Sequence, residues 1–294
     1  METYEKTITS KANFHLAGIV PVAGGHTGLE LPFPDVMLPI ANDYTLLDAA
    51  IVECAYAGCD TIWIICNDDT APLLRHRIGD YIEDPSYYYF NTSANREHRK
   101  RIPIFWVPIH PKDRDKRDCL SWSVIYGSLC AFKIASKISK WVIPDKYYVS
   151  FPYGLINPRD LVGSRKFINS KDNFYVMSDN QTVQDNIYCS FTFGKDEFVK
   201  YRRNVRKGTG RYKGTFENME TLPLEKRWSA RFFEPKDVFT DLDLDQANLL
   251  ITNNFHNIAS WEEYHTYMRS DYSQQIEKPP GDLFSYKEFH GIAT

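Results

Sequence analysis

The sequence lacks most of the features that mark membrane, secreted and nucleic-acid-binding proteins. Its 294 residues contain no apolar run near the roughly 18–20 residues that span a membrane. The N-terminal residues have neither the basic nor the apolar segment of a secretory signal. A net charge of −3 gives no overall attraction to nucleic acid. We therefore expect a cytoplasmic protein without membrane association, and nucleic acid is not an expected partner.

A cysteine framework is also missing from the sequence. The six cysteines are scattered without Cys-x-x-Cys spacing, so we interpret them as buried free thiols rather than disulfides or zinc ligands. Aromatic residues, by contrast, make up 15% of the chain and include 19 tyrosines. Many of these tyrosines are expected at the surface or at an interface, because a core cannot hold all of them.

The apolar patterns of the first half alternate between strands and helices, which is typical of an α/β fold. The all-apolar run Thr61–Cys66 predicts a strand buried in a parallel sheet. Helical spacing over Thr45–Ala57, closed by Gly58, predicts an amphipathic helix. The remaining expectations are strands at 18–22, 102–109 and 147–151, helices at 71–82 (with Gly79 as an early end) and 120–137, and a charged loop at 110–118.

The second half has a more strand-like pattern. Ser260, followed three residues later by Glu263, forms a capping box that predicts a helix over Ser260–Met268. No Gly/Ser-rich linker or internal repeat divides the chain, so we expect one domain over residues 1–294. The remaining expectations are strands at 174–177, 188–193 and 249–252 and helices at 198–203 and 234–242.

A run of small residues follows the first expected strand. Glycines in this position let a ligand approach the backbone and turn N–H groups toward a phosphate. A protonated histidine in the run would add a hydrogen bond to that phosphate. The predicted nucleotide-binding residues are Val22, Ala23, Gly24, Gly25, His26, Thr27 and Gly28.

The stretch Ala17–Ile40 resembles the opening of the sugar-1-phosphate nucleotidyltransferases, which have a strand, an A-G-x-G-T-R loop and then P-K-x-L-L-P-I. Met37–Ile40 corresponds to L-L-P-I, and Ala57–Gly58 to an A-G that ends the next helix. The resemblance covers residues 15–160 in order, and residues 257–264 are similar to a segment near the end of these enzymes, where the chain enters a helix.

This resemblance implies a fold and a ligand class. The fold is three-layer α/β/α with a mainly parallel central sheet, as in the nucleotide-diphospho-sugar transferases and related GT-A-like proteins. Residues 15–160 would form the nucleotide-binding half, and residues 161–294 the sugar-side and C-terminal elements. The expected partners are a nucleoside triphosphate or a sugar phosphate, and an active member would use Mg²⁺ to neutralise phosphate charge.

Several residues depart from the family pattern at the charged positions. Gly28 stands where the loop arginine belongs, and Asp35 replaces the lysine of P-K. The positions of the family's two metal-binding aspartates correspond to residues near Tyr153 and near Asn257 in this sequence. Since phosphoryl chemistry depends on cations placed around the phosphates, we predict a degenerate catalytic apparatus, with no assigned catalytic residue and no metal site.

Two basic segments could supply replacement cations. The loop His110–Asp118 lies at the C-terminal edge of an expected strand, where α/β sheets bind ligands, but it also contains aspartates that would pair with its cations. The run Lys200–Lys213 could bind phosphate or an acidic protein partner, and is more simply interpreted as an exposed face.

The leading hypothesis is therefore a nucleotidyltransferase-like protein of nucleotide-sugar metabolism that retains at most nucleotide or sugar-phosphate binding. One alternative is a structural or protein-interaction module that reuses the fold. Another is a GT-A-type glycosyltransferase, in which Asp68–Asp69 or the pair Asp241 and Asp243 would hold a divalent metal. Asp68–Asp69 also suits a helix N-cap, and the Asp241 set suits plain solvation.

Overall fold

The computed structural model describes most of the chain. The described residues are 14–25, 27–86, 100–138, 143–208, 212–213, 220–221, 223, 233–240, 243–244, 247–279 and 283–285.

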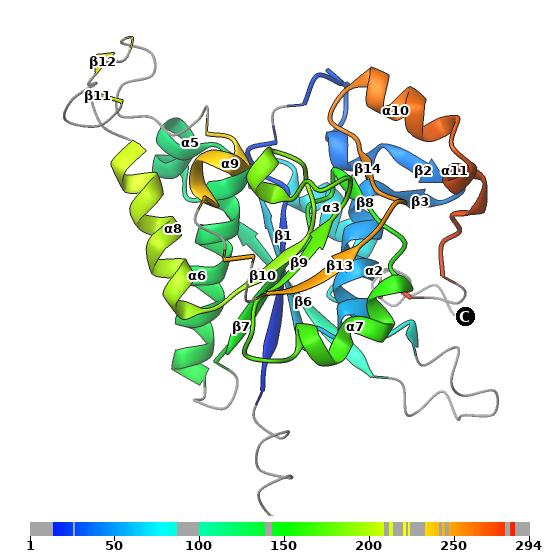
Figure 1. Cartoon of the computed structure of the whole chain (residues 1–294), viewed down its shortest axis with the longest axis horizontal. Coiled ribbons are helices and arrows are strands. Elements are labelled where there is room, and N and C mark those ends of the chain that lie inside the picture. Colours follow the sequence, from blue (N-terminus) through cyan, green and yellow to red (C-terminus); the bar gives the residue numbers. More distant parts are fainter. Residues whose placement is uncertain are drawn as a thin grey trace, which may run out of the picture.

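An eight-stranded sheet forms the centre of the molecule, with strand order β13-β9-β10-β7-β1-β4-β6-β5 (Figure 1). Neighbouring strands are parallel except where β10 and β5 are involved, so the sheet is mainly parallel, as predicted. Their bounds are β1 Leu16–Pro21, β4 Thr61–Cys66, β5 Tyr81–Glu83, β6 Arg101–Pro108, β7 Lys146–Val149, β9 Phe174–Met177, β10 Phe191–Phe193 and β13 Asn248–Ile251.

Three short ladders accompany the central sheet. Strand β2 (Pro39–Ala41) pairs with β3 (Tyr44–Thr45), and β11 (Tyr212–Lys213) pairs with β12 (Glu220–Thr221). The third ladder joins segments far apart in the sequence, because β8 (Gly154–Leu155) pairs with β14 (His256–Asn257). The helices are η1 Asp35–Met37, α2 Leu46–Ala57, α3 Ala71–Ile78, α5 Pro111–Arg117, α6 Leu120–Ile138, α7 Asp160–Ile168, η4 Val183–Asp185, α8 Lys195–Gly208, α9 Pro235–Val238, α10 Trp261–Met268 and α11 Asp271–Gln275.

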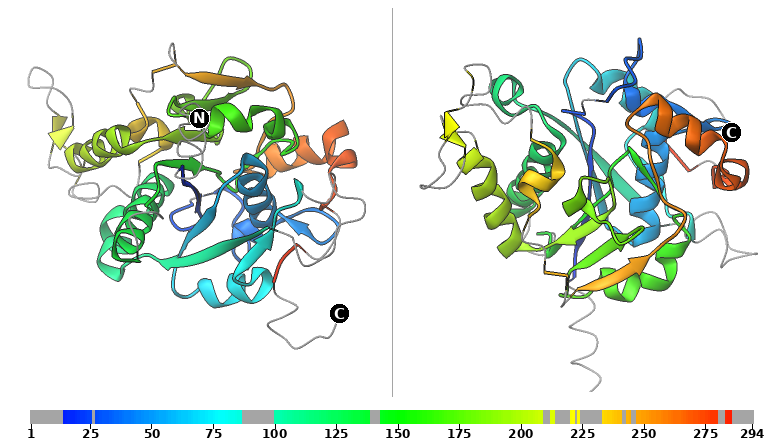
Figure 2. Two further views of the ribbon diagram at one scale, coloured as in Figure 1. Left: turned by 90° about the horizontal axis from the view of Figure 1, so that it is seen from below. Right: turned by 45° about the horizontal axis from the view of Figure 1, so that its top comes forward.

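Helices cover both faces of the sheet and make the three layers. Helices α6, α8 and α9 lie on one face, and α2 and α7 on the other (Figures 1 and 2). Two glycines allow this close packing. A Cβ on Gly18 would lie 2.9 Å from Cys54 Sγ of α2, and a Cβ on Gly127 of α6 would lie 2.3 Å from Ile65 Cδ1. Strands sandwiched in this way are apolar throughout, which explains the pattern of Thr61–Cys66.

The chain changes direction across the sheet at β1. From β1 it passes to β4 and then β6 on one side, and it later returns to β7 on the opposite side of β1. The strands β1 and β7 therefore flank a topological switch point. In open α/β sheets, ligands bind beyond the carboxyl ends of the strands at such a point.

Most predicted elements are present, with shifted ends. Helix α3 ends at Gly79, the early end considered from the sequence, and Ser260 caps α10 by accepting a hydrogen bond from the Glu263 amide. The predicted charged loop at 110–118 is wrong, since α5 occupies residues 111–117 with Pro111 in its first turn and His110 as N-cap. The other differences are a longer α8, a shorter α9 and a strand β10 confined to residues 191–193.

Tyrosines contribute more to the interior than the sequence analysis expected. Tyr44, Tyr148 and Tyr267 are among the largest fully buried side chains. The phenol of Tyr267 donates to the Ile40 carbonyl at 2.8 Å, and the phenol of Tyr148 donates to Glu53 at 2.7 Å. A buried hydroxyl with a partner costs little, so the core holds tyrosines that composition alone assigns to the surface.

The interpretation of the cysteines is confirmed. All six are free thiols, five of them buried and Cys130 half-buried. Among the described residues, no helix combines the length and the apolarity needed to cross a membrane.

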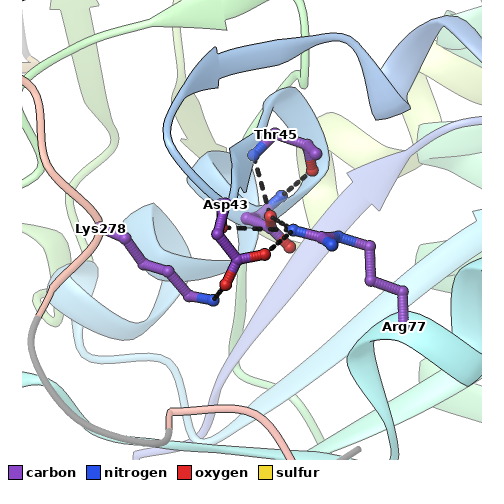
Figure 3. Close-up of polar contacts among 5 residues, drawn as sticks. Asp43, Thr45, Arg77 and Lys278 are labelled. Atoms are coloured by element: carbon purple, nitrogen blue, oxygen red, sulfur yellow. Dashed lines mark hydrogen bonds and ion pairs between the residues drawn. The ribbon is translucent and has the colours of Figure 1, made fainter.

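A polar cluster ties the C-terminal segment to the N-terminal half (Figure 3). Asp48, which is 1% exposed, accepts hydrogen bonds from the Thr45 amide at 2.8 Å and from Arg77 of α3 at 2.7 Å. Arg77 also pairs with Asp43 at 3.3 Å, and Lys278 reaches the other oxygen of Asp43 at 2.8 Å. The cluster fixes the β2–β3 turn against α2 and α3.

Candidate functional site

A pocket of about 230 Å³ opens at the switch point beside the glycine loop. Its walls come from the ends of β1 and β4, from η1 and the residues before it, from the residue after α5, and from the turn after β7. The lining residues are Val22, Ala23, Gly24, Gly25, Phe33, Pro34, Asp35, Val36, Asn67, Thr70, Asp118 and Tyr153.

The glycines of the loop make room for the protein's own chain. Gly24 has a φ of +78°, and a Cβ there would lie 2.5 Å from the backbone of Cys119. A Cβ on Gly25 would lie 2.5 Å from the phenol oxygen of Tyr153. The close approach that these glycines allow is therefore used, on these sides, by Cys119 just before α6 and by the turn after β7.

Backbone groups of the loop are also engaged within the protein. The amides of Val22 and Ala23 both donate to the Ile65 carbonyl, at 2.8 and 2.9 Å. The Gly28 amide donates to the Ala259 carbonyl at 2.8 Å, which fastens the end of the loop to the segment before α10. These three N–H groups already have acceptors, so they do not form an anion-binding cradle.

The predicted nucleotide-binding residues divide into three groups. Val22, Ala23, Gly24 and Gly25 line the pocket, whereas His26 lies outside the described residues. Thr27 donates its hydroxyl to Asp35, and Gly28 lies against Ala259, so neither lines the pocket.

The pocket also contains residues that the sequence analysis did not select. Phe33, Val36, Asn67, Thr70 and Asp118 line it. Asn67 carries the clearest signal, because it follows directly after the buried strand β4, at the edge where ligands bind. Phe33 and Asp118 join the pocket only through the fold of distant segments.

The ladder between β8 and β14 brings together the two positions that matched metal-binding aspartates. Asn257 pairs with Gly154, and the Ile258 amide donates to the Tyr153 carbonyl at 2.7 Å. The Asn257 amide group donates to Glu263 at 2.6 Å, and its oxygen accepts from the Tyr188 amide at 3.3 Å. Both polar ends of Asn257 are thus engaged.

Tyr153, in the turn after β7, contributes a buried aromatic ring. It is 2% exposed, and its ring centroid lies 5.7 Å from that of Tyr188. Burial, together with the nearby Asp35 carboxylate, raises the pKa of Tyr153 well above its usual value of about 10, so the phenol stays protonated at neutral pH. Mg²⁺ requires several carboxylate or water oxygens in octahedral geometry. A neutral phenol and an engaged amide do not fit it, and the described residues contain no group of three potential metal ligands.

Negative charge dominates the polar lining of the pocket. Asp35 and Asp118 both contribute to it, and none of the described lining residues is a lysine or an arginine. Phe33, 43% exposed, adds an aromatic face at the pocket.

Arg114 of α5 lies close to the pocket but is bound elsewhere. Its guanidinium contacts Asp68 at 2.8 Å, Asp69 at 2.9 Å and the side-chain oxygen of Asn67 at 3.1 Å. The N-cap interpretation of Asp68–Asp69 is therefore wrong: Thr70 is the N-cap of α3, without a side-chain cap, and the two aspartates bind Arg114 instead.

The other basic segments do not face this pocket. Arg117 pairs with Asp113 at 3.0 Å and stacks over Trp122 at 4.6 Å. In the run Lys200–Lys213, residues 200–208 belong to α8, which buries Tyr201 and Val205, while residues 209–211 lie outside the described part. Asp241 also lies outside it, so the proposed pair with Asp243 has no described geometry.

Comparison with known proteins supports the fold. No family model matches the sequence, and no curated protein matches it. A solved structure of a putative glucose-1-phosphate thymidylyltransferase from Bacillus anthracis, in complex with a sucrose, is 10% identical, with a TM-score of 0.55 over 90% of this chain and 98% of that one. An apo UDP-glucose pyrophosphorylase is 13% identical, with a TM-score of 0.53 over 90% of this chain and all of that one. The chain therefore has the nucleotidyltransferase fold.

Proposed function

We propose that this chain is a nucleotidyltransferase-like protein of nucleotide-sugar metabolism that binds a nucleotide or sugar compound and does not carry out metal-dependent nucleotidyl transfer. The two solved structures compared above are named as a glucose-1-phosphate thymidylyltransferase and a UDP-glucose pyrophosphorylase, and the pocket lies at the switch point where this fold class binds ligands. All of its lining residues fall within 22–153, which supports residues 15–160 as the ligand-binding half.

The observation that carries this proposal is the pairing of Tyr153 with the Asn257 segment. The fold places the turn after β7 beside β14, yet the side chains there are a buried phenol and an amide with both ends engaged. No carboxylate pair faces the glycine loop from these two positions. Without such a pair, these two positions give Mg²⁺ no anchor from which to neutralise the pentacoordinate phosphorus of the transition state.

Two measurements on the purified chain test the proposal together. Pyrophosphate release is followed with Mg²⁺, each nucleoside triphosphate and a panel of sugar-1-phosphates, and we expect no protein-dependent release. Thermal unfolding is then measured with nucleosides, nucleotides, sugars, sugar phosphates and nucleotide sugars. A compound that binds the folded state at 100 times its Kd stabilises it by about 2.7 kcal/mol, so the melting temperature rises.

Matched variants localise any binding to the pocket. Phe33 lines the pocket and is 43% exposed, whereas Phe167 on α7 is 52% exposed and is not among the lining residues. Phe33→Ala should reduce the ligand-induced shift, and Phe167→Ala should leave it unchanged. Robust pyrophosphate release would overturn the claim about catalysis. A flat thermal profile across the panel would instead favour the interaction module.

A further inference from the structure

We propose that the pocket recognises the uncharged, hydroxyl-bearing part of its ligand, a sugar ring or a nucleoside, and that a phosphate on that part weakens binding. This inference rests on the proposed function, because it specifies the ligand class of the same pocket. It departs from what a glycine loop after a strand leads one to expect, which is a site that favours phosphate.

The charge of the lining residues is the first observation behind the inference. Asp35 and Asp118 both line the pocket, and no lysine or arginine does so among the described residues. A phosphate placed between these walls would meet like charge at short range in a partly desolvated space, where Coulomb repulsion is stronger than in water. An uncharged ligand meets no such repulsion.

The second observation is that Arg114 and two amides of the loop, which could otherwise bind a phosphate, are already engaged within the protein. Within the described part of the chain, the Arg114 guanidinium contacts the side chains of Asn67, Asp68 and Asp69 in one turn. The amides of Val22 and Ala23 share the Ile65 carbonyl as their acceptor. A phosphate would have to break charge-assisted bonds of Arg114 before forming any with it, so Arg114 is not a ready partner for a phosphate.

The same residues suit the hydroxyl groups of a sugar. A carboxylate accepts hydrogen bonds through two oxygens, and in Asp35 the Thr27 hydroxyl binds one of them, Oδ2. Asn67 and Thr70 add an amide and a hydroxyl to the lining, and the partly exposed ring of Phe33 adds an apolar face. In small-molecule pockets, placed polar groups of this kind fix the orientation of the ligand.

The volume of the pocket favours a small ligand as well. At about 230 Å³ it lies below the roughly 300–1,000 Å³ of pockets that enclose drug-sized molecules. One sugar ring, or one nucleoside entering by its ribose, is in keeping with that volume, whereas a complete nucleoside triphosphate would extend beyond the walls.

Isothermal titration with matched pairs tests the inference. Glucose is compared with glucose-1-phosphate, and each nucleoside with its own 5′-monophosphate, so that one phosphate is the difference within a pair. We expect the uncharged member of the binding pair to have a Kd at least tenfold lower. Added NaCl should reduce this difference in Kd, because salt screens the repulsion between the phosphate and the partly exposed carboxylates.

Charge-neutral variants give a second readout on the same pairs. Asp35→Asn together with Asp118→Asn should reduce the ratio of the two Kd values within a pair by tenfold or more. Asp68→Asn together with Asp69→Asn, which removes the two carboxylate partners of Arg114, should also improve phosphate binding. Asp80→Asn removes the partner of Arg75 at a surface pair and should change nothing.

The outcomes separate the inference from the proposed function. Tighter binding of the phosphorylated member by the unmodified protein would overturn the inference and leave the proposed function standing. A preference for the uncharged member that does not respond to salt would also count against the role given to Asp35 and Asp118. Failure of both members of every pair to bind would overturn the proposed function and the inference together.

Discussion

Replacing Glu53 with glutamine should remove a dependence of folding stability on pH. Glu53 lies in α2, is fully buried, and accepts hydrogen bonds from the hydroxyls of Tyr148, Ser150 and Ser190. Burial raises its pKa from 4.5 to about 7, although the hydrogen bonds from Ser190, Tyr148 and Ser150 act in the opposite direction. Ser150 leads into the turn of Tyr153, so this network also supports one wall of the pocket.

The direction in which folding stability changes with pH follows from the raised pKa of Glu53. The folded state holds its proton up to about pH 7, whereas the unfolded chain releases it near 4.5. The stabilisation is therefore fully present below 4.5 and is lost as pH rises through 7. At 1.36 kcal/mol per pKa unit the whole effect is about 3 kcal/mol, and most of it falls between pH 5 and pH 8.5.

Urea unfolding at pH 5 and pH 8.5 measures the effect. The difference in free energy of unfolding between the two pH values should shrink by about 2–3 kcal/mol in Glu53→Gln relative to the unmodified protein. The exposed Glu262 on α10 supplies the control, since Glu262→Gln should keep the original pH dependence. An unchanged pH dependence in Glu53→Gln would refute the assignment of this titration to Glu53.

Three further variants test the packing around the site by the same urea measurement. Gly24→Ala should lower the free energy of unfolding by at least about 2 kcal/mol, because Gly24 has φ +78° and a Cβ there would meet the Cys119 backbone at 2.5 Å. Gly163→Ala is the control and should not destabilise the protein, because a Cβ at Gly163 meets nothing within 4 Å. Lys146→Met should cost about 3 kcal/mol, because the buried ammonium donates to the carbonyls of Ile168, Ser170 and Asp172; an unchanged midpoint would contradict this role. Tyr267→Phe should cost about 1 kcal/mol through loss of its bond to the Ile40 carbonyl, and no loss would mean that water replaces it.

Local patterns were enough to predict the frame of the fold. Strand β4 is recognisable because a strand covered on both faces must be apolar along its whole length. Helix α2 is recognisable because Gly58 ends it in the left-handed conformation, with φ 90°. Both signals depend only on residues close together in the chain.

The candidate site could be predicted only in part, because it depends on contacts between distant segments. The sequence indicates the small residues Val22–Gly25, but not that Tyr153 and Cys119 pack against them. It indicates cations in residues 110–118, but not that Arg114 of α5 binds Asp68 and Asp69 in the turn between β4 and α3. Pairing partners of this kind have no local signature, so the charge of the pocket becomes visible only in the folded chain.

The most direct test of the central claim is pyrophosphate release by the purified full chain at high concentration, with Mg²⁺, all four nucleoside triphosphates and a panel of sugar-1-phosphates. The geometry of Tyr153 and Asn257 predicts release no faster than in the protein-free control. Release that increases with protein concentration and is abolished by a chelator would contradict the claim, because it would require a Mg²⁺ site that these residues cannot form.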